Sequence, residues 1–589
     1  MAGIRLLVLT AFGAAAAAGQ VTFTLRTPAA LGIDTVFSYI NNSFVDYDQD
    51  GWLDFFSYVI YRNDGSGEHF TRLDSTRILE SELVDWADFD GDGDPDLVTN
   101  RKYGGNTYDT NFILVYRNEG PPFWTLRNVS ELLGLGRRDT IFDRDLVDPA
   151  WLDYNQDGWL DFFLTSYEWP YNSAQGKPDH LFRSEAGQSF TDVSDESGIA
   201  TPWYCSRGAS LFDFDEDGDV DIFVSVYRLQ PNLLWQNNGD GTFTDVAEAK
   251  GVQGLYIGGY YGHNIGAALA DYNNDGHLDI FTPITHHAGY PGDSTGHLWI
   301  NNGPPNWDFT CRFQGSGMRN TEIGSSPSGA DFDNDGDIDL LWTNIYGAPR
   351  PDYYLYRNDG NCHFTDVSDS VGLGPRQRIN YGIWADFNND GALDLFWARY
   401  DGSAYHYEFW VNSGNANHWL ELDLRGNYPN TSAIGARIDV WAESLRVTRE
   451  VLHNQGEHYG SLFIGRQHFG LGQHTMVDSV VIRWPDGERT VATQLPVDTI
   501  ITITQGPPAV QEPRLGQKPM TASIALRGKE LQLAGSGAGV LVIDGSGRVR
   551  ERVLPGPDGK TRWRPNAAGV YFLFDRADGS GRVSKVIVR

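Results

Sequence analysis

The chain has 589 residues and a formal net charge of −33, which makes nucleic acid an unexpected partner because its phosphates would be repelled. Beyond residue 20, no stretch approaches the roughly 18 consecutive apolar residues of a membrane helix, so no transmembrane segment is expected. The three cysteines at positions 205, 311 and 362 are too few for a disulfide framework. They are read either as packed thiols, which we favour, or as including one pair between Cys311 and Cys362.

The first 20 residues, MAGIRLLVLTAFGAAAAAGQ, have the order of a secretory signal peptide. Arg5 precedes an apolar stretch from Leu6, and small residues follow at positions 16 to 18. We therefore expect a secreted protein whose mature chain starts near residue 21.

A nine-residue pattern, Asp-x-Asp/Asn-x-Asp-Gly-x-x-Asp, occurs seven times between residues 46 and 394. Calcium takes about six to eight oxygen ligands, and side chains at positions 1, 3, 5 and 9 plus the carbonyl at position 7 can supply them. Gly at position 6 permits the sharp bend that gathers these oxygens. Each copy, here called an Asp loop, is predicted to hold one structural calcium ion, about seven in all. The predicted ligands are Asp46, Asp48, Asp50, Trp52, Asp54, Asp88, Asp90, Asp92, Asp94, Asp96, Asp153, Asn155, Asp157, Trp159, Asp161, Asp213, Asp215, Asp217, Asp219, Asp221, Asp271, Asn273, Asp275, His277, Asp279, Asp331, Asp333, Asp335, Asp337, Asp339, Asp386, Asn388, Asp390, Ala392 and Asp394.

The flanks of the Asp loops indicate strands, not the helices of an EF-hand. Position 2 is always Tyr or Phe, apolar pairs such as Ile222-Phe223 follow position 9, and the bidentate Glu of an EF-hand is absent. An aromatic strand with a Gly/Asn turn follows each loop, as in WQNNGDGTFTDV from Trp235, which is typical of a hairpin. Successive loops start 42 to 65 residues apart, close to the repeat length of a four-stranded propeller blade. The sequence predicts an all-β, seven-bladed propeller.

The DxDxDGxxD loop and the NNGDGTFTDV hairpin resemble the FG-GAP/VCBS repeat family over residues 21–415. Members of that family, including the integrin alpha-subunit head, fold as calcium-bearing β-propellers, so the resemblance implies the same fold here. FTLRTPAALGI from Phe23 resembles FTDVSDESGI from Phe190. We therefore expect an N-terminal strand to complete the last blade and close the ring, which removes exposed sheet edges.

The fifth repeat departs from the others in two segments, YIGGYYGHNIG from Tyr256 and THHAGYPGDSTGH from Thr285. Aromatic rings stack on sugar faces, and histidine can act as a base or a ligand. An irregular polar loop is the alternative that we favour, because loops commonly collect such residues without function. The candidate ligand-binding residues are Tyr260, Tyr261, His263, His286, His287 and Tyr290.

Residues 416–507 contain NTSAIGARIDVW, HFGLG and VIRWPDGERT, which resemble the ASPIC/UnbV domain. That domain also follows VCBS propellers in the cartilage acidic protein family. The stretch EHYGSLFIGRQ from Glu457 departs from the family's glycine-tyrosine-serine-glutamine run, so no shared ligand is carried over. No EGF module follows, and the resemblance is therefore to bacterial-type members. His453 and His468 lack a tight metal spacing and are expected to serve packing or surface roles.

A Pro-rich linker at residues 508–519 precedes a final region, residues 520–589, with Gly-rich hairpins that predict a small β-sandwich. Its ending, AAGVYFLFDRADGSGRVSKVIVR, resembles the C-terminal sorting domain of the type IX secretion system. Members of that family cross the outer membrane and are then released or anchored at the surface. The resemblance implies outer-membrane secretion machinery as a partner and a place outside the cell or on the bacterial surface.

Three functions are compatible with these features. We favour a non-enzymatic adhesion or recognition protein that presents propeller loops to a glycan or a cell-surface protein. The alternatives are a calcium-dependent, lyase-like polysaccharide enzyme, since some polysaccharide lyases resemble this chain as calcium-rich propellers, and a self-associating subunit of a surface layer or filament. No GxSxG, HExxH, Walker or Rossmann motif occurs, so no catalytic or organic-cofactor residue is predicted.

Overall fold

The computed structural model divides into two compact units, Met1–Gln505 and Gly506–Arg589. The described residues are 21–34, 42–78, 83–102, 111–135, 146–168, 173–285, 296–319, 324–344, 353–376, 378–453, 455–456, 465–506 and the C-terminal strands given below. The predicted signal peptide and Pro-rich linker lie outside them and remain predictions. No helix of the described residues is long and apolar enough to cross a membrane.

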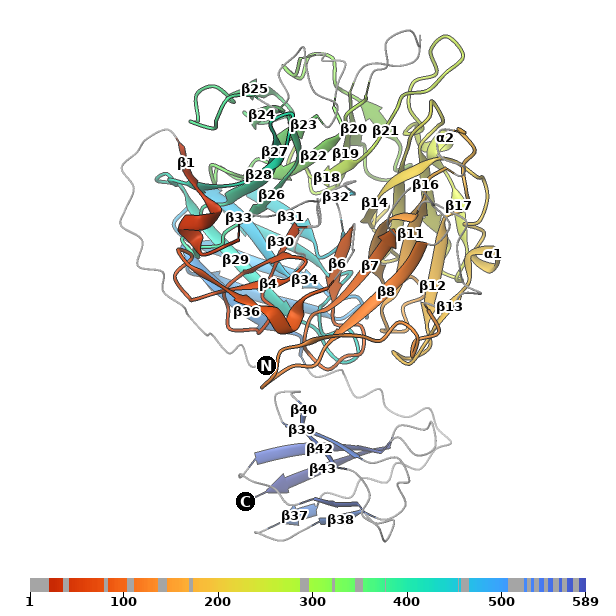
Figure 1. Cartoon of the computed structure of the whole chain (residues 1–589), viewed down its shortest axis with the longest axis vertical. Helices are drawn as coiled ribbons and strands as arrows, with labels where there is room; N and C mark the ends of the chain where they lie inside the picture. Colours follow the sequence, from red (N-terminus) through yellow and green to blue (C-terminus); the bar gives the residue numbers. More distant parts are fainter. Residues whose placement is uncertain are drawn as a thin grey trace. The chain divides into compact units, whose positions relative to one another are not determined.

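Seven sheets occupy the described part of residues 23–412, and each is built mainly from four antiparallel strands (Figure 1). The first three sheets contain β2 (Asn42–Val45), β3 (Asp54–Ser57), β4 (Ile60–Asn63) and β5 (Phe70–Leu73); β6 (Val84–Ala87), β7 (Asp96–Lys102), β8 (Asn111–Asn118) and β9 (Leu126–Asn128); and β10 (Leu146–Leu152), β11 (Asp161–Ser166), β12 (His180–Ser184) and β13 (Phe190–Asp192). The fourth and fifth contain β14 (Ser206–Phe212), β15 (Asp221–Val226), β16 (Leu233–Asn237) and β17 (Phe243–Asp245); and β18 (Ala267–Ala270), β19 (Asp279–Thr282), β20 (His297–Asn301) and β21 (Phe309–Cys311).

The sixth sheet contains β22 (Ser326–Ala330), β23 (Asp339–Thr343), β24 (Tyr353–Asn358) and β25 (Phe364–Asp366), and the seventh contains β26 (Ile379–Ala385), β27 (Asp394–Tyr400), β28 (Tyr405–Asn412) and β1 (Phe23–Arg26). Short helical turns are η1 (Pro28–Leu31), η2 (Asp74–Thr76), α1 (Ser194–Ser197) and α2 (Ala247–Lys250). The predicted all-β class and repeated four-stranded sheets are confirmed, and the number of propeller blades is taken up below as a proposal.

The N-terminal strand completes the seventh sheet, as the sequence predicted. Strand β1 pairs antiparallel with β28, with Phe23 opposite Asn412. In every sheet an Asp loop joins the first strand to the second, and in the first six sheets the predicted hairpin joins the third strand to the fourth. The N-terminal strand β1 is therefore part of the same sheet as the last repeat.

Burial decreases from the first strand of a sheet to the fourth. Every residue of β14 and β15 is buried, whereas β17 buries only Phe243. The aromatic side chain at position 2 of each Asp loop is also buried, as at Tyr47 and Phe214. The inner strands pack between neighbouring sheets, so both of their faces are apolar.

A buried carboxylate joins each Asp loop to the hairpin of its own sheet. In the fourth sheet Asp221, at position 9, accepts hydrogen bonds from the backbone N–H of Phe214 at 3.1 Å and of Asn237 at 2.8 Å. The equivalent hairpin N–H donates to Asp54, Asp96, Asp161, Asp279, Asp339 and Asp394. Position 9 therefore organises the repeat as well as being a candidate ligand.

In six of the seven sheets the side chain of the hairpin asparagine joins the sheet to the one before it. Asn237 Nδ2 donates to the carbonyl of Tyr154, at position 2 of the preceding loop, over 2.8 Å. The same contact runs from Asn118, Asn301, Asn358 and Asn412 to Tyr47, Phe214, Tyr272 and Phe332. Asn63 donates to the carbonyl of Phe387 over 2.9 Å and so joins the first sheet to the seventh. Ser184 occupies this position in the third sheet.

Residues 418–504 form a smaller domain within the first unit. One sheet contains β29 (His418–Arg425), β33 (Arg466–Gly472) and β36 (Thr499–Thr504), and the other contains β30 (Arg437–Ala442), β31 (Leu445–Glu450), β34 (Val477–Arg483) and β35 (Arg489–Leu495). Side chains from both sheets, such as Leu422 and Ile482, share one buried core. This region is called the second domain below.

The second unit contains β37 (Ile524–Leu526), β38 (Leu531–Leu533), β39 (Val540–Asp544), β40 (Val549–Val553), β41 (Thr561–Trp563), β42 (Gly569–Asp575) and β43 (Arg582–Val588). Five of these strands form one sheet in the order β37-β43-β42-β39-β40, and β38 pairs with β41. The predicted strands are present, and the predicted sandwich remains a prediction.

We predict that Asn63→Ala lowers the free energy of unfolding by about 1–3 kcal/mol, because it leaves buried carbonyls at Leu53 and Phe387 without their donor. Denaturant unfolding in excess calcium would measure the change. Asn238→Ala is the matched control. Asn238 is an exposed asparagine in the hairpin of the fourth sheet, and among the described residues its side chain bonds to the side chains of Thr242 and Thr244. Equal effects of the two substitutions would contradict the proposed role of Asn63.

Candidate metal centres

The seven Asp loops share one backbone conformation. The glycine at position 6 has φ between 82° and 99° in all seven, which is the left-handed region that the sequence predicted for it. Position 4 also has a positive φ, between 54° and 73°, although it is Gly only at Gly91. The sequence analysis did not predict this positive φ at position 4. In the other six loops position 4 is Gln, Glu or Asn, and this restricted composition was the signal that could have indicated it.

Carboxylates at positions 1 and 5 fold the loop around a common centre. In the fourth loop Asp213 accepts the N–H of Asp217 and of Gly218, each at 3.0 Å. Asp217 in turn accepts the N–H of Asp219, at position 7, over 2.9 Å. The same position-7 N–H bond occurs at Trp52, Asp94, Trp159, His277, Asp337 and Ala392. The predicted ligand positions 1, 5 and 7 are therefore brought together.

Carboxylate oxygens gather in four of the loops as a divalent cation would require. Three carboxylate oxygens lie within 4.8 Å of one another in the loops that start at Asp46, Asp88, Asp213 and Asp331. At position 3, the Oδ1 atoms of Asp48, Asp215 and Asp333 are buried and have no hydrogen-bond partner among the described residues. Unpaired buried carboxylate oxygens next to other carboxylates fit a hard cation such as calcium.

The other three loops carry Asn at position 3. Asn155, Asn273 and Asn388 donate from Nδ2 to the position-5 carboxylate at 3.2, 2.8 and 3.0 Å. Rotation of the amide by half a turn would present its oxygen to the same centre. These loops therefore offer the same set of donor atoms with one negative charge fewer.

Burial raises the pKa of the loop carboxyls. It raises the pKa of Asp46 and of Asp333 to about 7, and that of Asp213 to about 8, where the nearby charge of Glu450 adds to the effect. Burial therefore favours the protonated, uncharged carboxyl. A bound cation has the opposite effect on the pKa, because it stabilises the ionised carboxylate.

Side chains at position 4 connect six of the seven loops to the next, the exception being the second loop, where position 4 is Gly91. Gln156 Nε2 donates to Asp219 Oδ1 over 2.5 Å, and Asn274 Nδ2 donates to Asp337 Oδ1 over 2.6 Å. Equivalent contacts join Gln49 to Asp94, Glu216 to His277 and Asn334 to Gly391. Asn389 donates to the carbonyl of Gly51 over 3.0 Å and so joins the seventh loop to the first. The loops thus lie next to one another at one end of the sheets.

The second domain contacts all seven loops. Arg466 forms hydrogen bonds with the first and seventh loops, and Thr431 and Ser432 form them with the second. Arg437 and Glu450 contact the fourth loop, and Arg437 and Arg446 contact the fifth. His468 contacts the sixth. At the third loop Trp159 contacts Tyr428, with ring centroids 5.3 Å apart. The second domain therefore lies against this end of the sheets, although Asp50, Asp157 and Asp217 stay exposed.

A segment of the second domain also reaches the inner edges of the sheets. Strand β32 (Gln455–Gly456) pairs antiparallel with β18, the first strand of the fifth sheet, and lies beside it in Figure 1. The carbonyl of His453 accepts the N–H of Leu211 over 2.7 Å. The His453 imidazole lies 3.6 Å from an oxygen of Asp85 and 3.9 Å from one of Asp148. Burial opposes the charged imidazole, but these carboxylates outweigh it and raise the pKa of His453 to about 9.

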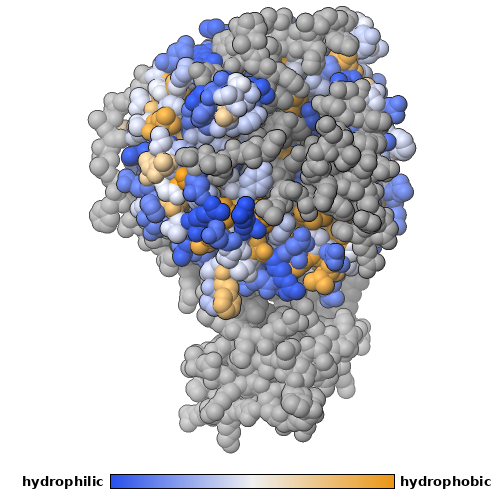
Figure 2. Space-filling model, viewed as in Figure 1, coloured by the Kyte–Doolittle hydropathy of each residue, from blue (hydrophilic) through white to orange (hydrophobic). Residues whose placement is uncertain are grey.

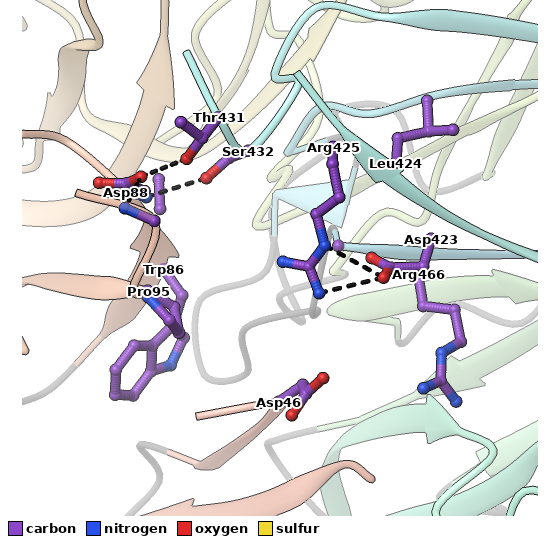
Figure 3. Close-up of a pocket in the computed structure, with 13 residues that line it drawn as sticks. Asp46, Trp86, Asp88, Pro95, Asp423, Leu424, Arg425, Thr431, Ser432 and Arg466 are labelled. Atoms are coloured by element: carbon purple, nitrogen blue, oxygen red, sulfur yellow. Dashed lines mark hydrogen bonds and ion pairs between the residues drawn. The ribbon is translucent and has the colours of Figure 1, made fainter. Parts of the chain in front are cut away.

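A cavity of about 60 Å³ lies between the first two loops and the second domain (Figure 3). Asp46 and Asp88 line it from the loops. Arg425 lines it from the second domain and is paired with Asp423 at 3.0 Å. Thr431 and Ser432 lie beside Asp88 in the same view. Most of these polar groups are paired with one another, so the cavity belongs to the junction between the loops and the domain.

Of the candidate ligand residues of the fifth repeat, the structure describes Tyr260, Tyr261 and His263. Tyr260 is 41% exposed, whereas His263 is buried, with its ring centroid 4.5 Å from that of Tyr227. His286, His287 and Tyr290 lie outside the described residues. The candidate ligand role of these residues therefore stays a prediction, with His263 buried and Tyr260 exposed.

The three cysteines are free thiols in this structure. Cys205 and Cys362 are buried, and burial raises the pKa of each to about 12. Cys311 is exposed. The alternative of a pair between Cys311 and Cys362 is therefore not what the structure contains, and only two of the three thiols are packed.

Two known protein families match parts of this chain, one a repeat that matches four segments and the other a domain that matches once. Residues 46–99, 153–224, 213–282 and 331–397 match the family described as FG-GAP-like repeat, and residues 426–509 match the family described as ASPIC and UnbV. The chain therefore carries FG-GAP-like repeats and an ASPIC/UnbV domain, as the sequence predicted.

The chain is similar to cartilage acidic protein 1 of Mus musculus, with 27% identity over 433 residues, and of Homo sapiens, with 26% identity over 416 residues. These matches cover 69% and 68% of this chain and 62% and 59% of the relatives. The chain thus spans less than two thirds of the length of the curated relatives it matches.

Solved structures with some likeness include a Trypanosoma rangeli sialidase in complex with the inhibitor DANA, with a TM-score of 0.32 and 9% identity over 64% of this chain and 59% of that chain. An exo-beta-1,3-galactanase from Phanerochaete chrysosporium gives a TM-score of 0.30 and 10% identity over 69% of this chain and 96% of that chain. TM-scores this low carry no argument about this protein.

We predict that, in EGTA, the melting temperature falls as the pH rises from 5 to 8. The folded-state pKa values of about 7 to 8 lie above the ordinary value of 3.8, so protonated loop carboxyls stabilise the metal-free fold below about pH 4. That stability is lost as the pH rises through about 7 to 8. Excess calcium should abolish this fall in melting temperature. A site with free calcium at a hundredfold excess over its Kd adds about 2.7 kcal/mol to the free energy of unfolding.

Differential scanning calorimetry of the full chain at pH 5, 6, 7 and 8 would measure this. EGTA that has been saturated with calcium is the control for the chelator itself. Identical melting temperatures in EGTA and in calcium at pH 8 would contradict the assignment of the loops as structural calcium sites.

Proposed function

We propose that this chain is a secreted or cell-surface calcium-binding protein that recognises a glycan or a protein partner without catalysing a reaction. Its seven sheets are the blades of a β-propeller, and about seven calcium ions occupy the Asp loops through the ligands named above. The repeated loop geometry and the FG-GAP-like repeats support this proposal. A type IX sorting role for the C-terminal unit and release or anchoring at a bacterial surface belong to the same proposal.

The observation that carries the proposal is that the second domain covers the end of the sheets where the Asp loops lie. Successive strands run in opposite directions, so the connections from the second to the third strand and from the fourth strand to the next sheet lie at the other end. Recognition of a partner by propeller loops is therefore assigned to that opposite end, where connecting loops commonly carry function.

Exposed aromatic side chains occur in the connections at that end. Trp203, before β14, is 59% exposed, and Tyr256 and Tyr260, before β18, are 65% and 41% exposed. The rings of Tyr256 and Tyr261 lie 5.0 Å apart. Most of the coloured surface visible in Figure 2 is hydrophilic, with apolar residues in small groups. Flat aromatic groups on a polar surface suit the stacking of a sugar ring.

The test is a glycan array and a polysaccharide-depolymerisation assay on the full mature chain, with calcium and with EGTA. Binding without product supports a recognition protein. New reducing ends or unsaturated uronates would instead establish a polysaccharide-active enzyme. Concentration-dependent self-association without glycan binding would favour a subunit of a surface layer or filament.

We predict that a Tyr256→Ala/Tyr260→Ala double variant weakens binding to the best glycan at least about tenfold, because truncating two anchoring aromatic residues removes about 1.4 kcal/mol or more. Phe123→Ala is the matched control, since Phe123 is 77% exposed but lies in the hairpin turn at the Asp-loop end. Isothermal titration calorimetry would compare the three proteins. Equal binding by the double variant and the parent chain would contradict the placement of the recognition surface.

A further inference from the structure

Signature residues of the second domain lie directly on the Asp loops. In the NTSAIGA segment, the Thr431 hydroxyl donates to the Asp88 carboxylate, and Ser432 Oγ accepts the Asp88 N–H over 2.9 Å. In the HFGLG segment, His468 Nε2 lies 2.7 Å from Asn334 Oδ1. The residues that identify this domain in the sequence are thus residues that touch the loops.

Gly470 of the HFGLG segment is required by this contact. A Cβ atom at Gly470 would lie 1.9 Å from Asp331 Oδ2, so any larger residue would push the sixth loop away. The next glycine, Gly472, donates its N–H to the carbonyl of Asn334 over 2.8 Å. The motif therefore fits the closed shape of an Asp loop.

The arginines of the second domain bind the outside of the loops and leave the inward-facing oxygens to a cation. Arg466 donates to the carbonyl of Gly51 over 2.7 Å, and Arg446 donates to the carbonyl of Asp275 over 3.1 Å. Gly51 occupies position 6 and Asp275 position 5, and neither carbonyl is among the predicted calcium ligands. At these two loops docking and cation binding thus use different atoms, whereas at the second loop Thr431 donates to the carboxylate of Asp88, which is itself a predicted ligand.

Each of these arginines is neutralised within its own domain. Arg437 lies 2.9 Å from Glu450, and Arg446 lies 2.8 Å from Asp439. Arg466 lies 3.3 Å from Glu421. A neutral arginine–carboxylate pair neither replaces a calcium ion nor repels one, so the surface fits a loop that is already occupied.

We propose that the face of the second domain formed by residues 428–453 and 465–472 is a docking surface for calcium-occupied Asp loops, so that domain docking and calcium binding are coupled. This inference rests on the calcium binding proposed above. Without a cation, the clustered carboxylates repel one another and the loop opens, which turns the carbonyls at positions 5 and 6 away from the arginines. Coupling is reciprocal, so loss of docking must also weaken calcium binding.

The first test uses single-loop variants of the full chain in hydrogen–deuterium exchange. Asp390→Asn weakens the seventh loop, whose Asn389 contacts Arg466, and should speed exchange at residues 466–472 by about fivefold or more. Asp157→Asn weakens the third loop, whose Trp159 contacts Tyr428, and should speed exchange at residues 428–432 instead. Unchanged exchange at both segments, or the same change in both variants, would overturn the proposal.

The second test measures the reciprocal effect by calcium titration. Arg466→Gln should lower the affinity of one or two sites by about fivefold or more. Arg446→Gln, which changes a more exposed contact, provides a second variant if Arg466→Gln fails to fold. Arg489→Gln on the exposed edge strand β35 is the matched control and should titrate as the parent chain does.

The outcomes separate this inference from the proposed function. If the parent chain binds no calcium, the calcium assignment itself fails, and the coupling fails with it. If the parent chain binds calcium and the arginine variants titrate identically to it, the coupling alone is overturned.

Discussion

Repulsion among clustered carboxylates is the constraint on which the rest of this structure depends. Each Asp loop brings three or four ionisable side chains around one centre, and burial makes their charged forms costly, as the pKa of about 8 at Asp213 illustrates. A divalent cation resolves this conflict, because it supplies positive charge where the carboxylates converge. The same side chains then stabilise the fold that they would otherwise open.

The Asp loops also connect neighbouring sheets through hydrogen bonds. Asp221 fixes the hairpin residue Asn237 within its own sheet, and Asn237 reaches back to the preceding loop at Tyr154. Position-4 side chains add a second set of contacts, ending with Asn389 at Gly51. Because each contact involves a loop, the state of one loop affects two neighbouring sheets. The second domain then rests on the assembled loops and not on any single repeat.

Local patterns predicted most of the repeat but not the contacts between distant segments. The glycine at position 6, the buried aromatic residue at position 2 and the pairing of the strand at Phe23 followed from residue type and spacing. Docking of Arg466 on Gly51 joins residues more than 400 positions apart, and no local period encodes it. The burial of His263 against Tyr227 is a second contact that residue type and spacing did not predict.

In the function proposed above, calcium is the organising element of the first unit. The most direct test is a crystal structure of the full chain grown in calcium, with anomalous scattering used to locate the ions and elemental analysis of the dialysed protein used to count them. The account predicts about seven calcium ions per chain, each enclosed by positions 1, 3, 5, 7 and 9 of one Asp loop. A folded chain with no ions in these loops, or with ions bound elsewhere, would contradict it.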